Sequence, residues 1–390
     1  MADNTRTLAA HARGELMAVV KADGFGHGAV GVARAALGAG ATWLGATGLG
    51  EALALRAAGL GGPILSWLNP PGADFASAVA RRIDLAVPSL AHLAAMPPGA
   101  RVHLHLDTGM ARDGADAGEW LALCRAAREA ELCGRVVVIG VMSHLAGPDT
   151  PEAVRRFREG VAIAYAMGLR PRVRHLAATA ATLTDPGTHF DLVRTGAGLV
   201  GIDPSGTTAL RGAMTLSAPV VEVRRVAAGT PVGYDHTWRA PRTTTLALLP
   251  VGYADGLPRN AGPHAEVLLG GRRCPIAGRI SMDQIVVDAG PGEGAGPGEG
   301  AGPGEGAGPG EGAGPGDGAG PGDGAGPGDG AGPGDGAGPG VRLGDTAIVF
   351  GPGDDGEPTV ADWAAWAGTL PHEIVTGLGP RPHRHVIGGI

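Results

Sequence analysis

The sequence predicts an N-terminal (β/α)8 barrel, or TIM barrel, followed by a β-rich C-terminal domain. Its 390 residues exceed the about 250 to 300 residues that one hydrophobic core usually serves. From Leu16 to Gly201, apolar β-rich runs alternate eight times with Ala-rich segments whose apolar residues have helical spacing. After Gly201 the apolar runs are short, and helical patterns are almost absent until Val360. We therefore expect the barrel at 1–206 and the second domain at 207–390.

The first strand of the barrel follows DNTRTLAAHARG, which has the pattern of the end of a helix. A doubly wound sheet is disfavoured, because no GxGxxG follows a strand with an acidic residue about 20 positions later. The eight strands are expected near 16–21, 42–46, 63–67, 84–87, 101–107, 137–143, 173–177 and 191–194.

A hexapeptide repeat interrupts the second domain at 289–340, with four copies of AGPGEG, four of AGPGDG and a final AGPG. Gly at alternate positions and Pro in every unit oppose helices and sheet ladders, and no apolar residue is available to anchor a core. We expect a disordered acidic loop between QIVVD and DTAIVF, which belong to one domain.

The charge and the cysteine content exclude several classes of partner. The formal net charge is -7, and the repeat alone carries eight acidic residues, so the rest of the chain is close to neutral. Binding to nucleic acid or to an anionic membrane is therefore not expected. No apolar run of about 18 residues appears, and Met1 to Ala10 is polar and lacks the apolar segment of a signal peptide. We therefore expect neither a membrane span nor a signal peptide. Three cysteines at no metal spacing cannot form a disulfide framework, which favours a cytoplasmic protein; they are Cys124, Cys133 and Cys274.

The stretch that dominates the sequence is LMAVVKADGFGHGAV, from Leu16 to Val30. A buried strand ends at Lys21, and Gly24, Gly26 and Gly28 open a turn into a helix. A lysine after a strand is ordinarily a solvated side chain. This string, however, closely resembles the pyridoxal phosphate (PLP) lysine motif of the alanine racemase family. The resemblance implies that Lys21 forms a Schiff base with PLP.

The resemblance also implies how the cofactor is held. Thr179, in HLAATAATL after the seventh strand, occupies the place of the family's phosphate-binding serine. In DLVRTGAGLVG, after the eighth strand, the amides of Gly196 and Ala197 would face the phosphate, as barrel loops 7 and 8 commonly do. Arg194 in the same motif would face the pyridine nitrogen. A fixed cation there disfavours protonation of the ring nitrogen and weakens the electron sink, which suits racemisation.

Two further residues of the barrel complete the implied cofactor site. Arg112, in HLHLDTGMARDG, matches the arginine that bonds the PLP phenolate oxygen and helps to bind substrate. His144, in GVMSHL, matches a histidine that packs beside the ring and bonds the arginine of the eighth strand.

Racemisation needs acid/base groups on both faces of the substrate's Cα. Lys21 would serve one face, and the resemblance assigns the other to Tyr234 in GTPVGYDHTW, contributed by the partner of a homodimer with shared sites. Met282 in GRISMDQ would offer its backbone amide to the substrate carboxylate. The residues implied at the entryway are Tyr253, Arg259 and Asp283. The activity implied is interconversion of L-alanine and D-alanine, a small-molecule amino-acid substrate, for peptidoglycan synthesis.

Four positions depart from the family pattern. Phe25 and His372 each stand where a tyrosine commonly contacts the phosphate, and Ala178 replaces a usual asparagine. His105 stands where many members carry a lysine that orients Arg112. Because two tyrosine hydroxyls that would contact the phosphate are both absent, we expect PLP to be retained less tightly than is usual in the family.

Three alternatives stay open at this point. A related racemase could act on serine or on other amino acids, and a degenerate member could bind PLP with little activity. A metal-dependent barrel hydrolase would use the residues that alternate along the fifth strand, with histidines of later strands. That strand order is wrong for such hydrolases, so we expect no metal; the residues concerned are His103, His105, Asp107, His144 and His175.

Overall fold

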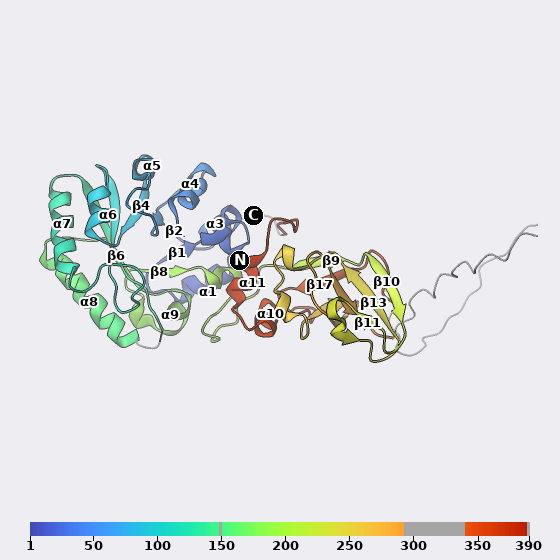
Figure 1. The fold of residues 1–390 in the computed structure, drawn as a ribbon. Helices are drawn as coiled ribbons and strands as arrows, with labels where there is room; N and C mark the ends of the chain where they lie inside the picture. The colour runs from blue at the N-terminus through green and yellow to red at the C-terminus, as the bar shows by residue number, and fades with distance from the viewer. Residues whose placement is uncertain (148–149, 292–339, 388–390) are drawn as a thin grey trace, which may run out of the picture.

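A computed structural model describes residues 1–147, 150–291 and 340–387 (Figure 1). Its N-terminal part is a parallel eight-stranded sheet in the order β7-β6-β5-β4-β3-β2-β1-β8. Backbone hydrogen bonds from Asp191 N to Arg174 O and from Arg194 N to Ala177 O, both 3.0 Å, bring the edge strands β7 and β8 together. The predicted fold class, a (β/α)8 barrel with a β-rich second domain, is confirmed. The strands are β1 (Glu15–Val19), β2 (Trp43–Ala46), β3 (Ile64–Ser66), β4 (Ile83–Val87), β5 (Ala100–His105), β6 (Val136–Met142), β7 (Val173–His175) and β8 (Leu192–Thr195).

Helices surround the barrel because the strands are apolar on both faces. In β1, Met17 and Val19 point into the barrel interior, whereas Leu16 and Ala18 pack outward against the helices. The surrounding helices are α1 (Ala2–His11), α2 (Lys21–Phe25), α3 (Ala29–Leu37), α4 (Leu49–Ala57), α5 (Phe75–Ala80), α6 (Leu90–Ala95), α7 (Trp120–Leu132), α8 (Thr150–Ala166) and α9 (Thr179–Thr184).

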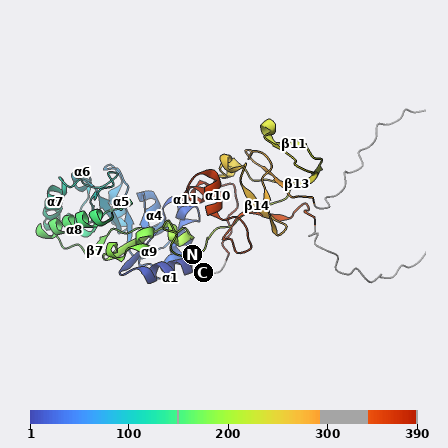
Figure 2. The same cartoon turned by 90° about the horizontal axis from the view of Figure 1, so that it is seen from below.

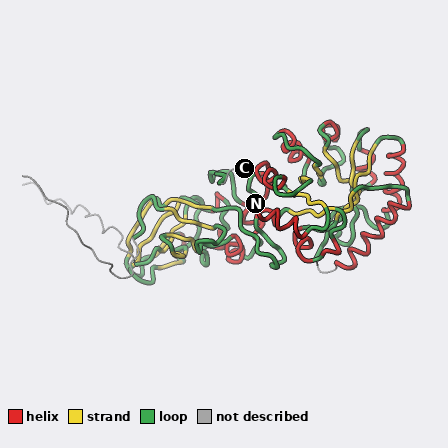
Figure 3. The backbone as a smooth tube through the Cα atoms, turned by 180° about the vertical axis from the view of Figure 1, so that it is seen from behind, coloured by secondary structure: helices red, strands yellow, loops and turns green. Residues whose placement is uncertain are grey.

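The second part contains two antiparallel sheets, separate from the barrel strands in Figure 3. One sheet has the order β10 (Glu222–Val226), β13 (Thr244–Leu249), β16 (Ile285–Asp288). The other has the order β15 (Arg272–Pro275), β14 (Glu266–Leu269), β17 (Thr346–Phe350), β9 (Leu216–Pro219). A short hairpin joins β11 (Pro231–Val232) to β12 (Trp238–Arg239), and two helices follow, α10 (Val360–Ala367) and α11 (Pro371–Gly377).

The strands on either side of the hexapeptide repeat, β16 and β17, contribute to the same hydrophobic core. Of the repeat at 289–340, residues 292–339 lie outside the described part of the chain, so the expected disorder stays a prediction. Among the described residues, no helix is both long and apolar enough to cross a bilayer.

Helix α11 lies between the barrel and the β-rich part (Figures 1 and 2). It connects the two parts because it packs on α2. Val375 of α11 belongs to the barrel's hydrophobic core. A Cβ added at Gly26 would lie 2.3 Å from the Val375 carbonyl oxygen, so the backbones of α2 and α11 meet at a distance that only glycine permits. The side chain of His372 thereby reaches the mouth of the barrel.

Candidate active site

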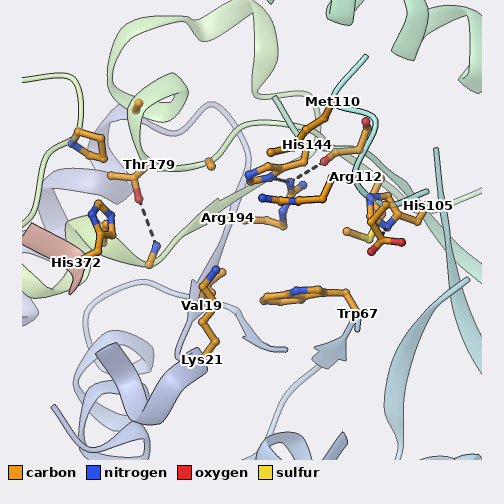
Figure 4. A pocket seen from close by; sticks show the side chains of 18 of the residues that line it. Val19, Lys21, Trp67, His105, Met110, Arg112, His144, Thr179, Arg194 and His372 are labelled. Atoms are coloured by element: carbon orange, nitrogen blue, oxygen red, sulfur yellow. Dashed lines mark hydrogen bonds and ion pairs between the residues drawn. The ribbon is translucent and has the colours of Figure 1, made fainter. Parts of the chain in front are cut away.

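A cavity of about 320 Å³ opens at the carboxyl ends of the barrel strands (Figure 4). This is the end at which barrel enzymes place their sites. Its lining comes from the loops that follow β1, β3, β5, β6, β7 and β8, together with α11. Residues that line it include Lys21, Phe25, Trp67, His105, Arg112, His144, Thr179, Arg194, Gly196, Ala197 and His372.

Lys21 does not end the first strand as predicted, because β1 stops at Val19 and Val20 leaves the extended region. Lys21 instead begins a tight turn in which four consecutive residues, 22–25, have φ between +51° and +63°. Such left-handed backbone is costly for residues other than glycine, so it is found where surrounding contacts enforce it. Here the Glu51 carboxylate accepts a hydrogen bond of 2.8 Å from Ala22 N. The turn directs the lysine side chain into the cavity (Figure 4).

The electrostatic surroundings favour the neutral amine of Lys21. Burial, and then the nearby Arg112 guanidinium, lower the pKa of this lysine below its ordinary value, against an opposing contribution from Glu51. A lowered pKa is what a lysine needs in order to act as a nucleophile or a base near neutral pH.

Arg194 on β8 is buried and donates only to neutral acceptors. Its partners are His175 Nδ1 at 3.0 Å, Ser143 O at 2.6 Å, Leu176 O at 3.1 Å and His144 Nδ1 at 3.2 Å. Burial lowers the pKa of Arg194 to about 10, so the guanidinium stays charged at neutral pH. Burial and the Arg194 charge lower the pKa of His144 to about 3, so its imidazole is neutral and Nδ1 can accept.

One end of the cavity has the form of an anion site. Thr179 is buried at the start of α9, and its Oγ1 accepts from Gly196 N at 3.3 Å and Gly198 N at 3.5 Å. A Cβ at Gly196 would lie 2.7 Å from the Phe25 ring, so glycine is required there. Across this end, His372 presents a buried Nδ1 that makes no hydrogen bond within the described residues.

The charges around the cavity favour an anionic ligand. Two guanidinium groups, Arg112 and Arg194, line it together with the Lys21 amine, and within residues 1–147, 150–291 and 340–387 none of the three forms a salt bridge. The two lining carboxylates are engaged elsewhere. Asp107 accepts from the amides of residues 109–111, and Asp113 accepts from Gly114 N and lies 3.3 Å from His105 Nδ1. The cavity therefore fits PLP, whose phosphate and phenolate oxygens are negatively charged.

The structure does not bring all candidate residues together. The residues predicted for the second base, the substrate carboxylate and the entryway belong to the second domain, and none of them lines this cavity. Tyr234 is 68% exposed and Met282 is 54% exposed. The hydrogen bonds from Tyr253 N to Ser281 O and from Ala254 N to Met282 O join two of these loops. Asp283 pairs with Arg381 at 2.6 Å, and Arg259 begins a short 3-10 turn at 259–261.

The barrel interior bears on the metal-dependent alternative. His103 Nδ1 lies 2.8 Å from His175 Nε2, and His103 Nε2 lies 3.3 Å from Asp84 Oδ2, so these imidazoles bond to one another and to a carboxylate. Across the described parts of the chain, no group of three or more His, Cys, Asp or Glu side chains is arranged to hold a metal ion.

Sequence reasoning missed Trp67, which lines the cavity just after β3, and Asp84, which faces the interior from β4. The position of Trp67 at a strand end is a signal that could have identified it. Asp84 has no comparable signal, because its role depends on a histidine of the next strand.

A (β/α)8 barrel that presents a lysine amine beside an anion site at its mouth, joined to a β-rich domain, defines a cofactor-binding barrel enzyme. The model of the alanine racemase N-terminal domain matches residues 1–204, and that of the C-terminal domain matches 213–301 and 335–386. The chain belongs to the alanine racemase family, and the predicted resemblance is confirmed.

Individual relatives agree over nearly the whole chain. The alanine racemase of Frankia casuarinae is 45% identical over 95% of this chain and 89% of its own length. That of Mycobacterium tuberculosis is 41% identical over 96% of this chain and 90% of its own. The crystal structure of alanine racemase from Streptomyces lavendulae, 39% identical, superposes with a TM-score of 0.84 over 100% of this chain and 95% of that one. The alanine racemase of Bartonella henselae, 26% identical with a TM-score of 0.78 over 99% of this chain and 96% of that one, carries covalently bound pyridoxal phosphate.

Proposed function

We propose that the protein is an alanine racemase that interconverts L-alanine and D-alanine with PLP bound at the barrel mouth. The observation that carries the proposal is the placement of the Lys21 amine, with its lowered pKa, beside an anion site in a chain of this family. The D-alanine produced would supply peptidoglycan synthesis. A cytoplasmic location agrees with the three cysteines, all of which are free thiols.

The family resemblance gives each of these lining residues a place around PLP. Thr179, Gly196 and Ala197 would hold the phosphate at the anion site, and Arg194 would face the ring nitrogen. Arg112 would bond the phenolate oxygen, and His144 would pack beside the ring while it accepts from Arg194. When bound, PLP supplies an aldehyde that combines with amines and a ring that withdraws electrons from the substrate's Cα.

The chain's own residues would then move one proton across the substrate. Lys21, once its amine is free, takes or returns the proton at Cα on one face, and its lowered pKa favours the neutral form that accepts. Tyr234 of the partner subunit does the same on the other face through its phenol oxygen. The substrate carboxylate would bind Arg112 and the Met282 backbone amide of the partner subunit.

A homodimer with shared sites is part of the proposal. Among the described residues of one chain, the cavity is lined by Lys21 but not by Tyr234 or Met282, which are exposed on the second domain. An exposed tyrosine and methionine next to the entryway residues are typical of a surface that meets another subunit. The second copy would also place Tyr253, Arg259 and Asp283 at the entrance, where His105 and His372 support the cavity from within.

The test is a racemisation assay with purified protein and added PLP, in which the enantiomers of alanine and of serine are separated on a chiral column. Turnover of alanine at a higher kcat/KM than serine is expected. Faster turnover of serine would replace the substrate, and absence of turnover with bound PLP would indicate a degenerate member. Borohydride reduction followed by peptide mass spectrometry should place a pyridoxyl group on Lys21, and its absence there would overturn the proposal.

A further inference from the structure

We propose that Asp84 and His103 are positioning residues that hold Arg194 in its cationic form, acting through His175. The inference rests on the proposed function, because that function places Arg194 against the ring nitrogen of PLP. It gives a role to a group of buried polar side chains that the proposed chemistry does not itself use.

The four side chains form one continuous chain of hydrogen bonds across the barrel interior. Arg194 Nη1 lies 3.0 Å from His175 Nδ1, and His175 Nε2 lies 2.8 Å from His103 Nδ1. His103 Nε2 then lies 3.3 Å from Asp84 Oδ2. The residues belong to β8, β7, β5 and β4, and none is more than 6% exposed.

The chemistry of the donors fixes the direction of every bond. A guanidinium can only donate, so His175 Nδ1 must accept and the proton of this ring resides on Nε2. That proton is donated to His103 Nδ1, which leaves the His103 proton on Nε2, where it is donated to the Asp84 carboxylate. Burial and the Arg194 charge keep the pKa of His175 well below its ordinary value, so the ring is neutral. In this series of hydrogen bonds, the charged groups are therefore the Arg194 guanidinium at one end and the Asp84 carboxylate at the other.

The backbone is shaped to admit the His103 ring. The register between β5 and β6 shifts after Val102, and the shift sets His103 opposite Gly140. A Cβ at Gly140 would lie 2.3 Å from His103 Nδ1, so any other residue would displace the imidazole. The Trp43 ring meets His103 edge-on at a centroid distance of 5.5 Å. The orientation of His103 is thus fixed by packing as well as by its hydrogen bonds.

Arg194 needs a counter-charge that its direct partners do not provide. Its four acceptors are neutral, and burial lowers its pKa to about 10. Burial raises the pKa of Asp84, but the hydrogen bonds from His103 and Arg101 outweigh it, so the pKa of this carboxyl lies below its ordinary value. The Asp84 carboxylate orients both imidazoles so that a lone pair faces the guanidinium, and hydrogen bonds aligned in this way reinforce one another.

The other titratable groups around these four hydrogen-bonded side chains either disfavour the positive charge of Arg194 or leave it unchanged. The nearby cations Lys21 and Arg112 disfavour a further positive charge, since both lower the pKa of His144 together with Arg194. Within the described residues, the titratable groups that face Arg194 or the His103–His175 pair are Lys21, Asp84, His105, Arg112, His144 and, through Asp84, Arg101. Asp84 is the anion in this set, so its loss should make Arg194 deprotonate at lower pH.

The test compares Asp84→Asn and His103→Leu with the wild-type holoenzyme. Both the absorbance of bound PLP and kcat/KM are followed between about pH 6 and pH 10.5, where the alkaline transition reports loss of a required proton. We expect the transition to move to lower pH by about one unit in either variant, which means about a tenfold loss at the highest pH. The double variant should show the same shift as each single variant, because either substitution interrupts the same chain.

Asp288→Asn is the matched control, because Asp288 is a buried carboxylate of the second domain that bonds Thr244 and Gly290 N. It should lower thermal stability and leave the alkaline transition in place. If Asp84→Asn and His103→Leu behave like this control, the series of hydrogen bonds from Asp84 to Arg194 has only a structural role, and the proposal is wrong. Should Asp84→Asn fail to fold, His103→Leu carries the test, because Asp84 then keeps Arg101. A wild-type protein that binds PLP but does not racemise contradicts the proposed function, while the absorbance transition still decides the role of the chain.

Discussion

Arg194 illustrates how single residues set the chemistry of the cavity. A buried cation is stable only when its donors are satisfied, and each of its direct partners is a neutral carbonyl or imidazole acceptor. The net positive charge is therefore available to a ligand instead of being neutralised by an adjacent carboxylate. The same buried imidazoles that accept from Arg194 must stay neutral, which makes the stability of the fold depend on pH.

The first prediction concerns the stability of the protein at mildly acidic pH. His175 is fully buried with a pKa held well below 6.5 by burial and by Arg194, whereas in the unfolded chain it takes up a proton below about pH 6.5. The unfolded state then binds more protons, so the free energy of unfolding falls as pH falls, by up to about 1.4 kcal/mol per pH unit for this group. Urea denaturation at pH 7 and pH 5 measures the loss. His175→Gln should be less stable at pH 7 but show a smaller loss between the two pH values, and an equal loss would contradict the assignment.

The second prediction concerns retention of PLP. Phe25 lies against Gly196 and His372 faces the anion site, where the family pattern has two phenol hydroxyls. A hydrogen bond to a charged group contributes about 1.5 kcal/mol or more, so Phe25→Tyr and His372→Tyr should each lower the Kd for PLP by about tenfold. Equilibrium dialysis of the apoenzyme measures this, with Phe190→Tyr as a control away from the cavity. An unchanged Kd in both variants would show that the cavity does not use these positions for the phosphate.

At the scale of elements, the left-handed turn of α2 and the helix α11 depend on each other. The turn that directs Lys21 into the cavity also exposes the backbone of Gly26 to the Val375 carbonyl, so α11 can dock and bring His372 to the anion site. The proposed cofactor site of the barrel therefore includes an element that lies more than 300 residues further along the chain.

The third prediction tests this docking with a matched pair of glycines. Gly26 and Gly28 have similar φ angles of +77° and +86°, but a Cβ at Gly28 meets nothing within 4 Å. Gly28→Ala should cost only the backbone strain, about 1 kcal/mol of unfolding free energy. Gly26→Ala should cost about 1 to 3 kcal/mol more, because the methyl group overlaps the Val375 carbonyl. Chemical denaturation of both variants measures the difference, and equal losses would show that the contact with α11 is not tight in solution.

At the scale of the whole molecule, the proposed site draws its residues from both domains. The cavity of the barrel contains Lys21, whereas Tyr234 and Met282 are exposed on the other domain. The two domains have separate hydrophobic cores. The buried residues of the barrel core extend along the sequence to Ile202 and then include Val375 of α11, whereas those of the second core begin at Leu216. The boundary at 206/207 itself stays a prediction.

The fourth prediction tests whether the site is shared between subunits. Lys21→Ala and Tyr234→Phe should each reduce kcat by orders of magnitude, because each removes the acid/base group of one face. When the two variants are unfolded and refolded together, half of the dimers should be mixed, and each mixed dimer has one intact site. Activity should then return to about a quarter of the wild-type value. Refolding each variant alone is the control, and no recovery in the mixture would place Lys21 and Tyr234 in the same chain's site.

The sequence by itself determined the order and approximate positions of the eight barrel strands, the β-rich second domain, and the location of Lys21 at the barrel mouth. These features follow from the spacing of apolar residues and from glycine placement, which are local and survive in any environment. The predicted strand bounds differ from the structure by at most two residues at each end, and the first strand ends two residues early because Val20 leaves the extended region.

Only the tertiary structure decided which side chains meet. Barrel closure places His103 against His175, 72 residues further along the chain, and a register shift leaves room for the ring beside Gly140. The docking of α11 brings His372 to the anion site. Contacts of this kind depend on strand register and on how closely one backbone can approach another. No local pattern of residues encodes the register or the closest approach.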